Sequence, residues 1–158
     1  MDIELRSRQV DEVRIYFEKT EDDEINEMLP RSVLSMEQAI ENYNKSLLPD
    51  ASSFGKTIYL NGQYVGDVWC YCIDKNGTPE AMLSYCIFEK TLWGQGIATE
   101  SVAKFLNEIK QEYDLNSVGA FCFSKNAASL RVLEKNGFVL IETFIENGIQ
   151  SCYLEKQM

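Results

Sequence analysis

The spacing of hydrophobic residues predicts a long amphipathic helix directly after Gly96. Five apolar residues stand at positions i, i+3, i+4, i+7 and i+11 of one helix face: Val102, Phe105, Leu106, Ile109 and Tyr113. Polar residues occupy most of the positions between them. This segment is therefore expected to pack one face against a core and to expose the other to water.

Shorter helical patterns precede residue 50. Val13 and Phe17 share one face of a first helix, and Ile25 lies in a second, shorter helix. Ser35 is followed three residues later by Gln38, which is the spacing of a capping box at the start of a helix. A third helix is therefore predicted to begin after Ser35.

Apolar runs rich in β-branched and aromatic residues predict strands in the rest of the chain. The pairs Asn61-Gly62, Asn76-Gly77 and Asn147-Gly148 suit the left-handed dihedrals of tight hairpin turns. The predicted strands cover residues 3–5, 57–60, 63–73, 81–88, 117–123, 138–145 and 150–154. Asn136-Gly137 is instead expected to cap the end of a helix over residues 127–135. The order of these elements predicts one mixed α/β domain over residues 1–158.

Two glycines, Gly94 and Gly96, stand immediately before the long helix. Glycine allows a ligand to approach the backbone closely, and the first N–H groups of a helix lack internal partners and lie at the positive end of its dipole. An anion is therefore expected at this turn. A dinucleotide fingerprint would need Gly or Ala at Thr99, and a P-loop would need Gly-Lys-Ser/Thr; the sequence has neither.

The segment from Trp93 to Ala98 resembles the pyrophosphate loop of the GNAT acyltransferases, Arg/Gln-x-x-Gly-x-Gly/Ala. A second segment, from Asn126 to Phe138, resembles the Asn-x-x-Ser/Ala helix of the same family, which closes in Lys-x-Gly-Phe. Together the two segments are similar to the ribosomal-protein (RimJ/RimL-like) N-acetyltransferase branch. The resemblance covers about residues 81–138 and is looser before them.

The resemblance implies the GNAT fold, an α/β fold of the α+β kind. Its central sheet is mixed and mostly antiparallel, with six to seven strands and about four helices on its faces. Acetyl-CoA is the implied acyl donor. The residues assigned to it are Cys86, Ile87, Trp93, Gly94, Gln95, Gly96, Ile97, Ala98, Thr99, Asn126 and Lys135. In the family the strands on either side of the glycine turn and its helix splay apart, and main-chain groups of Cys86 and Ile87 would then bind the pantetheine arm.

The implied reaction is the attack of a primary amine on the thioester through a tetrahedral intermediate. The amine belongs to a protein N-terminus or to a small molecule. Many family members protonate the leaving thiolate with a tyrosine, but Leu133 occupies that position here. Ser129, one turn earlier on the same helix face, becomes the candidate acid, and Asn126, the expected helix N-cap, is the second candidate catalytic residue. No base is assigned, although Glu89 and Tyr85 are expected to lie nearby.

Composition narrows the classes of partner. The net charge of −10 argues against nucleic acid, whose binding depends on Lys and Arg, and favours a basic partner. The chain has no histidine, so a Ser-His pair is excluded, and its five cysteines lack the spacing of a metal site and are expected to be reduced. No metal is expected. The acidic N-terminus and short apolar runs argue against a membrane segment and favour a cytoplasmic protein.

Three hypotheses remain from the sequence. The chain is an N-acetyltransferase, a non-catalytic acyl-CoA-binding module on the same fold, or an unrelated α/β protein whose glycine turn binds another nucleotide. The sequence leaves open which amine is the acceptor and whether the chain acts as a monomer or as a homodimer.

Overall fold

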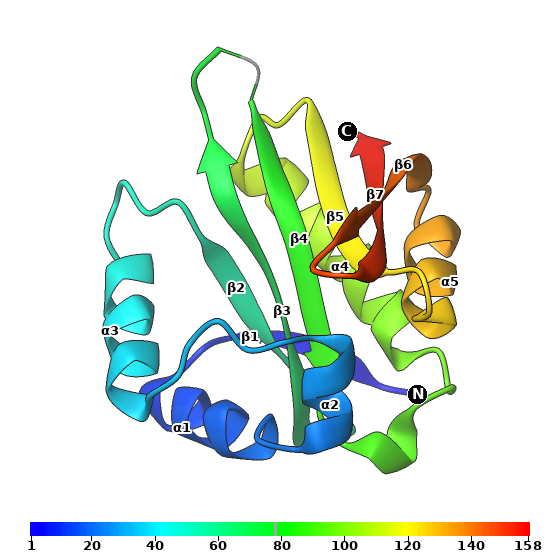
Figure 1. Cartoon of the computed structure of the whole chain (residues 1–158). Helices are drawn as coiled ribbons and strands as arrows, with labels where there is room; N and C mark the ends of the chain where they lie inside the picture. The colour runs from blue at the N-terminus through cyan, green and yellow to red at the C-terminus, as the bar shows by residue number, and fades with distance from the viewer. Residues whose placement is uncertain (78) are drawn as a thin grey trace.

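Seven strands form one sheet in a computed structural model that describes residues 1–77 and 79–158 (Figure 1). They are β1 (Ile3–Ser7), β2 (Phe54–Leu60), β3 (Gln63–Asp74), β4 (Glu80–Ile87), β5 (Ser117–Phe123), β6 (Val139–Glu146) and β7 (Ile149–Gln157). Their order in the sheet is β1-β2-β3-β4-β5-β7-β6. The neighbours β4 and β5 are parallel, and the other neighbouring pairs are antiparallel. The predicted mixed, mostly antiparallel sheet is confirmed.

Helices lie on both faces of this sheet. They are α1 (Val10–Lys19), α2 (Asp23–Met28), α3 (Met36–Ser46), α4 (Ile97–Glu112) and α5 (Ala127–Lys135), with a short 3-10 turn, η1, at Lys90–Leu92. Figure 1 shows α1 and α2 in front of the sheet and α4 behind it. The described residues thus contain one α-helix more than the four or so that the resemblance implied.

Turn chemistry determines where several elements end. Asn61 and Gly62, with φ of 49° and 84°, form the two-residue link between β2 and β3. The pair Asn147-Gly148 joins β6 to β7 in the same way. The predicted pair Asn76-Gly77 lies in a longer connection, residues 75–79, in which residue 78 is outside the described part of the chain. Gly137, with φ of 88°, follows α5 as predicted.

Helix caps agree with the sequence at α3 and add one at α1. The Ser35 side chain accepts a hydrogen bond from the Gln38 N–H at 3.1 Å. A reciprocal capping box that the sequence analysis missed joins Gln9 and Glu12 at the start of α1. The Glu12 carboxylate accepts from the Gln9 N–H at 2.7 Å. At the start of each of these two helices, a side chain therefore accepts a hydrogen bond from a main-chain N–H group.

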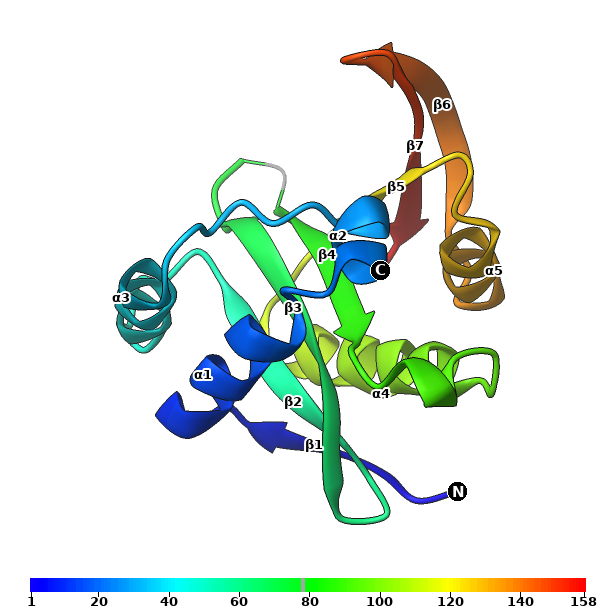
Figure 2. The same ribbon diagram turned by 60° about the horizontal axis from the view of Figure 1, so that its bottom comes forward.

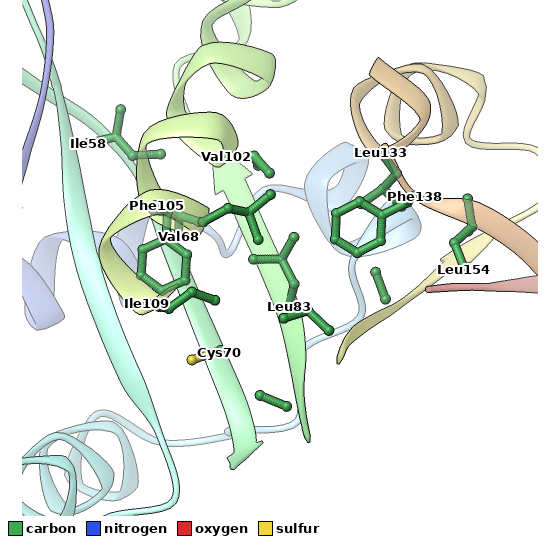
Figure 3. Close-up of a cluster of buried hydrophobic side chains, with 14 of the residues drawn as sticks. Ile58, Val68, Cys70, Leu83, Val102, Phe105, Ile109, Leu133, Phe138 and Leu154 are labelled. Atoms are coloured by element: carbon green, nitrogen blue, oxygen red, sulfur yellow. The ribbon is translucent and has the colours of Figure 1, made fainter. Parts of the chain in front are cut away.

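The main core lies between the sheet and α4 (Figure 3). Val102, Phe105 and Ile109 of α4 face Val68 and Leu83, and all five are at most 2% exposed. The core continues into the other half of the sheet through residues of α5, β7 and the loop after α5, labelled in the same view: Leu133, Phe138 and Leu154. The predicted amphipathic helix thus provides the central packing element.

A smaller apolar cluster lies on the opposite face, under α1 and α2. It contains Ile25, Cys86 and Phe88, with Tyr16 and Tyr64 packed against it. Beneath it β3 and β4 approach so closely that a Cβ atom added at Gly66 would overlap the carbonyl oxygen of Cys86. Glycine at this position therefore permits the close contact of the two strands.

Candidate active site

A cleft opens where β4 and β5 part. The two strands pair only from Glu80 with Ser117 to Met82 with Gly119, so the rest of each strand diverges from the other. A cavity of about 580 Å³ fills this space. It is lined by β4, the glycine turn, the start of α5 and the end of α2. The splay that the family resemblance implied is therefore present.

The glycine turn forms one end of the cavity. Gly94 and Gly96 have φ of 81° and 82°, and both open onto free space rather than onto other atoms. Gly96 is the N-cap of α4, so the N–H groups of Ile97, Ala98 and Thr99 belong to the first turn and have no partner within the helix. All three residues line the cavity. This geometry provides the predicted anion site.

Trp93 holds the glycine turn against β4. Its indole Nε1 donates to the carbonyl oxygen of Ile87 at 2.7 Å, while 41% of the residue stays exposed. Gln95 points elsewhere: its amide donates to the Thr91 carbonyl at 3.2 Å, and it is not among the residues that line the cavity. The other residues predicted to bind acetyl-CoA all line it, as does Ser129.

The start of α5 forms the opposite wall. The Asn126 side chain accepts a hydrogen bond from the Ser129 N–H at 3.1 Å, which makes it the predicted N-cap. The Ser129 hydroxyl lies 2.6 Å from the hydroxyl of Tyr85, which reaches across from β4. Burial raises the pKa of Tyr85 well above its usual value, and the hydrogen bond to Ser129 offsets this only in part. Tyr85 is therefore a neutral phenol at physiological pH.

Leu133 occupies the place where many GNAT members have a tyrosine. It is 1% exposed and belongs to the core, although it also borders the cavity. Cys122 borders the cavity as well, and burial raises the pKa of its thiol to about 11. Leu133 has no proton to donate, and the Cys122 thiol is not a thiolate at neutral pH.

Charged side chains around the cavity are basic. Lys125, Arg131 and Lys135 line it, and none of its lining residues within the described chain is Asp or Glu. Lys125 also pairs with Glu27 of α2 at 3.2 Å. Glu89, which the sequence placed near the site, pairs with Lys19 at 3.5 Å and does not border the cavity. The cavity therefore matches an anionic ligand and contains no carboxylate base.

Within the described residues, His, Cys, Asp and Glu side chains form no cluster of three or more that could bind a metal ion. In the same part of the chain, no helix combines the length and apolar character needed to cross a membrane.

Comparisons with known proteins agree with this geometry. A family model described as an acetyltransferase (GNAT) domain matches residues 2–139. No curated protein sequence matches the chain. RimL, a ribosomal L7/L12 alpha-N-protein acetyltransferase in complex with coenzyme A, has the same fold with a TM-score of 0.83 at 18% identity, over 99% of this chain and 94% of that one.

Two further solved structures share the fold. The aminoglycoside acetyltransferase AAC(6')-Ib in complex with coenzyme A gives a TM-score of 0.81 at 17% identity, over 99% of this chain and 95% of that one. A chimera of spermidine N-acetyltransferase SpeG from Vibrio cholerae and hSSAT gives 0.83 at 18% identity, over 99% and 96%. At these identities the likeness of all three structures concerns the fold, and the RimJ/RimL-like branch stays a prediction. Because the family model covers most of the sequence, this chain belongs to the GNAT family of acetyltransferases.

Proposed function

We propose that this chain transfers the acetyl group of acetyl-CoA to a primary amine. The observation that carries the proposal is the position of the glycine turn. Gly94 and Gly96 present the first N–H groups of α4 to the end of a cavity that runs between the splayed strands β4 and β5. A pyrophosphate at the turn would let an extended acyl-pantetheine chain follow the cleft.

The backbone of β4 supports this placement. The carbonyl of Cys86 lies against Gly66 of β3, and the N–H of Phe88 donates to β3 at 2.9 Å. Main-chain groups of successive residues point to alternate edges of a strand, so those of Tyr85 and Ile87 face the cleft. We therefore assign pantetheine binding to Tyr85 and Ile87. Cys86, predicted for this role, also lines the cavity, and its side chain belongs to the apolar cluster with Ile25 and Phe88.

Basic residues at the same cavity suit the phosphates of coenzyme A. Lys135, predicted to bind the cofactor, is the last residue of α5. The next residue, Asn136, donates from its side-chain amide to the Thr99 carbonyl at 3.2 Å, which places this end of α5 close to the N-terminus of α4. Arg131 lies one turn before Lys135. Their positive charge attracts the phosphates and offsets the repulsion between these phosphates and the acidic protein. Salt screens the repulsion from acidic residues more than about 8 Å away.

The reaction requires a neutral amine to attack the thioester carbon. A C–N bond then forms, the carbonyl oxygen becomes an oxyanion, and collapse of the intermediate breaks the C–S bond. Asn126 and Ser129 stand at the wall of the cavity where we place this chemistry. The thiolate of coenzyme A is a good leaving group, since thiols have a pKa of about 8.5, so acid assistance by Ser129 is expected to be modest.

The acceptor is proposed to be a basic amine, either a protein N-terminus or a small molecule. The net charge of −10 favours a cationic partner, and the acidic helix α2 contributes Ile25 and Met28 to the cavity. The proteins with the same fold act on different amines by name: an aminoglycoside, a ribosomal protein and spermidine. We place the reaction in the cytoplasm, which fits the five free cysteines.

The second candidate function is a non-catalytic acyl-CoA-binding module. Leu133 at the tyrosine position and the basic, carboxylate-free lining of the cavity favour it. Release of free coenzyme A thiol separates the two. Purified protein with acetyl-CoA is tested against α-amino peptides, polyamines, aminoglycosides and amino acids. We expect thiol release above the rate without amine for at least one class. Tight acetyl-CoA binding without release for any class would favour the binding module.

We propose further that two copies pair through β6. β6 lies at the edge of the sheet (Figure 2). It exposes large apolar side chains, among them Ile141 at 56% and Ile145 at 75%. An antiparallel pairing centred on Thr143 would place Ile141 of one copy opposite Ile145 of the other, with no glutamate of β6 directly opposite a second glutamate. Light scattering on a sizing column should report twice the mass of 18.1 kDa. A single-chain mass would refute the pairing.

A further inference from the structure

The geometry points to Tyr85 as the positioning residue that orients Ser129 toward the reacting atoms, an inference that rests on the proposed acetyl transfer. The two hydroxyls lie 2.6 Å apart, although the residues are 44 positions apart in the chain and belong to β4 and α5. Tyr85 thus joins the two walls of the cleft at the place where the acyl group is expected. Its phenol contacts the catalytic candidate directly.

The direction of this hydrogen bond follows from the chemistry of the two groups. A phenol is a far stronger acid than an aliphatic alcohol, so we assign the tyrosine as the donor and the serine hydroxyl as the acceptor; the main-chain carbonyl oxygen of Ser129 also lies 3.4 Å from the phenol. The burial of Tyr85 keeps its proton in place. A serine hydroxyl has two lone pairs and one proton. With one lone pair bound by Tyr85, Ser129 keeps a second lone pair and its O–H, and its other side-chain neighbour in the cavity wall is the Cys122 thiol.

Neither hydroxyl is suited to give up a proton outright. The pKa of an alcohol is close to that of water and lies far above the value of about 8.5 for the departing thiol, so net proton transfer from the alcohol to the thiolate is strongly unfavourable. Tyr85, whose pKa burial raises, is no better donor. Ser129 therefore acts as a relay that gives one proton as it takes another.

The relay balances the reaction without a carboxylate base. Attack by the amine leaves a positively charged nitrogen, and departure of coenzyme A leaves a negatively charged sulfur. A proton passes from the nitrogen to the free lone pair of Ser129 Oγ while the Ser129 proton passes to the sulfur. The products are a neutral amide and the thiol, and Ser129 ends unchanged. Tyr85 keeps its own proton and fixes the orientation of Ser129 throughout.

Tyr85→Phe tests the role, since it removes only the hydroxyl. We expect kcat to fall about tenfold, while the Kd for acetyl-CoA changes less than twofold. Ser129→Ala should lower kcat by tenfold to a hundredfold. Adding Tyr85→Phe to Ser129→Ala should produce no further loss, because the phenol would then have nothing to orient. Tyr153→Phe is the control: its hydroxyl binds Glu155 at 3.0 Å, away from the main cavity.

A second measurement does not require turnover. The thiol of bound coenzyme A is titrated by the thiolate absorbance near 240 nm, as a difference from the free protein. Hydrogen bonding by an oriented Ser129 should lower the pKa of the bound thiol below about 8.5, and both Tyr85→Phe and Ser129→Ala should return it toward that value. Cys86 and Cys122 do not interfere, because burial raises their pKa values to about 12 and about 11.

The outcomes are distinguishable from those for the proposed function. Additive losses in kcat, or a bound-thiol pKa that is the same in wild type and Tyr85→Phe, would refute the positioning role and leave Tyr85 as a packing residue. If no amine is acetylated but Tyr85→Phe still raises the pKa of the bound thiol, the proposed acetyl transfer fails and the orientation of Ser129 by Tyr85 is supported.

Discussion

The two faces of the sheet are stabilised by different kinds of contact. The face under α4 is a continuous apolar core, in which Phe105, Val68 and Leu154 are fully buried. The face under α1 has only the small cluster around Phe88, and next to it lies a buried polar network. The hydrophobic pattern of the sequence predicted the core on the first face, but it did not predict the polar network on the second.

The polar network is centred on Asp67, which is 2% exposed. Its carboxylate accepts from the Tyr64 hydroxyl at 2.5 Å and pairs with Arg8 at 3.0 Å. Nearby, Glu12 of α1 accepts from the Tyr59 hydroxyl. Arg8 retains one buried nitrogen, Nε, with no partner among the described residues. Loss of one contact in an apolar core lowers the stability by a limited amount. Loss of one partner in a buried charged network leaves another charge buried without its counter-ion and is more costly.

Arg8→Met should produce the largest change. It leaves the Asp67 carboxylate buried with Tyr64 as its remaining donor, and we expect unfolding in urea at pH 8 to require about 3–5 kcal/mol less free energy. The double variant Arg8→Met/Asp67→Leu should recover most of this loss, because it removes both charges. Arg14→Met, at an exposed position of α1, is the control and should change stability by less than about 0.5 kcal/mol. Equal losses in the single and double variants would mean that packing, not charge, dominates this face.

Gly96→Asp tests the phosphate site that the glycine motif predicts at the start of α4. An acidic side chain at the start of α4 should repel the pyrophosphate, while the surface position preserves the fold. Acetyl-CoA at one hundred times its Kd should stabilise wild type by about 2.7 kcal/mol, a Tm increase of roughly 5–10 °C. The variant should melt cooperatively with almost no increase at that ligand concentration.

Gly62→Asp is a matched control for that experiment. Gly62 has φ of 84°, against 82° for Gly96, and also faces open space, but it lies in the turn between β2 and β3, outside the cavity. It should keep the full ligand-induced increase in Tm. A full increase in Gly96→Asp would remove the phosphate site from the glycine turn.

The pH dependence of stability should show a smaller effect. Burial raises the pKa of Asp67 to about 6, and Arg8 and Tyr64 offset this only in part. Because this pKa exceeds the unfolded value of about 3.9, the protonated form favours folding. The contribution of Asp67 is therefore complete below pH 4 and is lost as the pH rises through about 6.

Asp67→Asn isolates this contribution. Urea unfolding from pH 4 to 7 should show a wild-type stability that falls relative to the variant, by at most about 1.4 kcal/mol per pH unit for one proton. Parallel stability curves for the two proteins would show that Asp67 has an ordinary pKa in the folded state.

Local patterns predicted much of the fold. The period of α4, the turns at Asn61-Gly62 and Asn147-Gly148 and the N-cap at Ser35 each depend on residues close in the chain, and these are present. The start of β2 was missed, because Gly55 and Lys56 read as polar, whereas they pair with Trp69 and Val68 in the sheet. Such pairing is a tertiary effect that local propensity does not contain.

The candidate site was predicted unevenly for the same reason. The glycine turn and the Asn126 cap are local, so the motifs located them. The contact between Tyr85 and Ser129 joins distant segments, and nothing in the spacing of either residue signals it. Arg8, Glu12 and Asp67 likewise read as surface charges until the fold buries them together.

Only three residue pairs connect β4 and β5 in the described part of the sheet, so the sheet is mechanically weakest next to the cleft where the acyl chain is expected to bind. An extended ligand that hydrogen-bonds to both strands would fasten the halves β1–β4 and β5–β7 to each other. The main-chain amides of Tyr85 and Ile87, which face the cleft rather than β3, should then exchange with solvent much more slowly in the complex than in the free protein. In that sense the substrate completes the sheet, and ligand binding and rigidity become a single event.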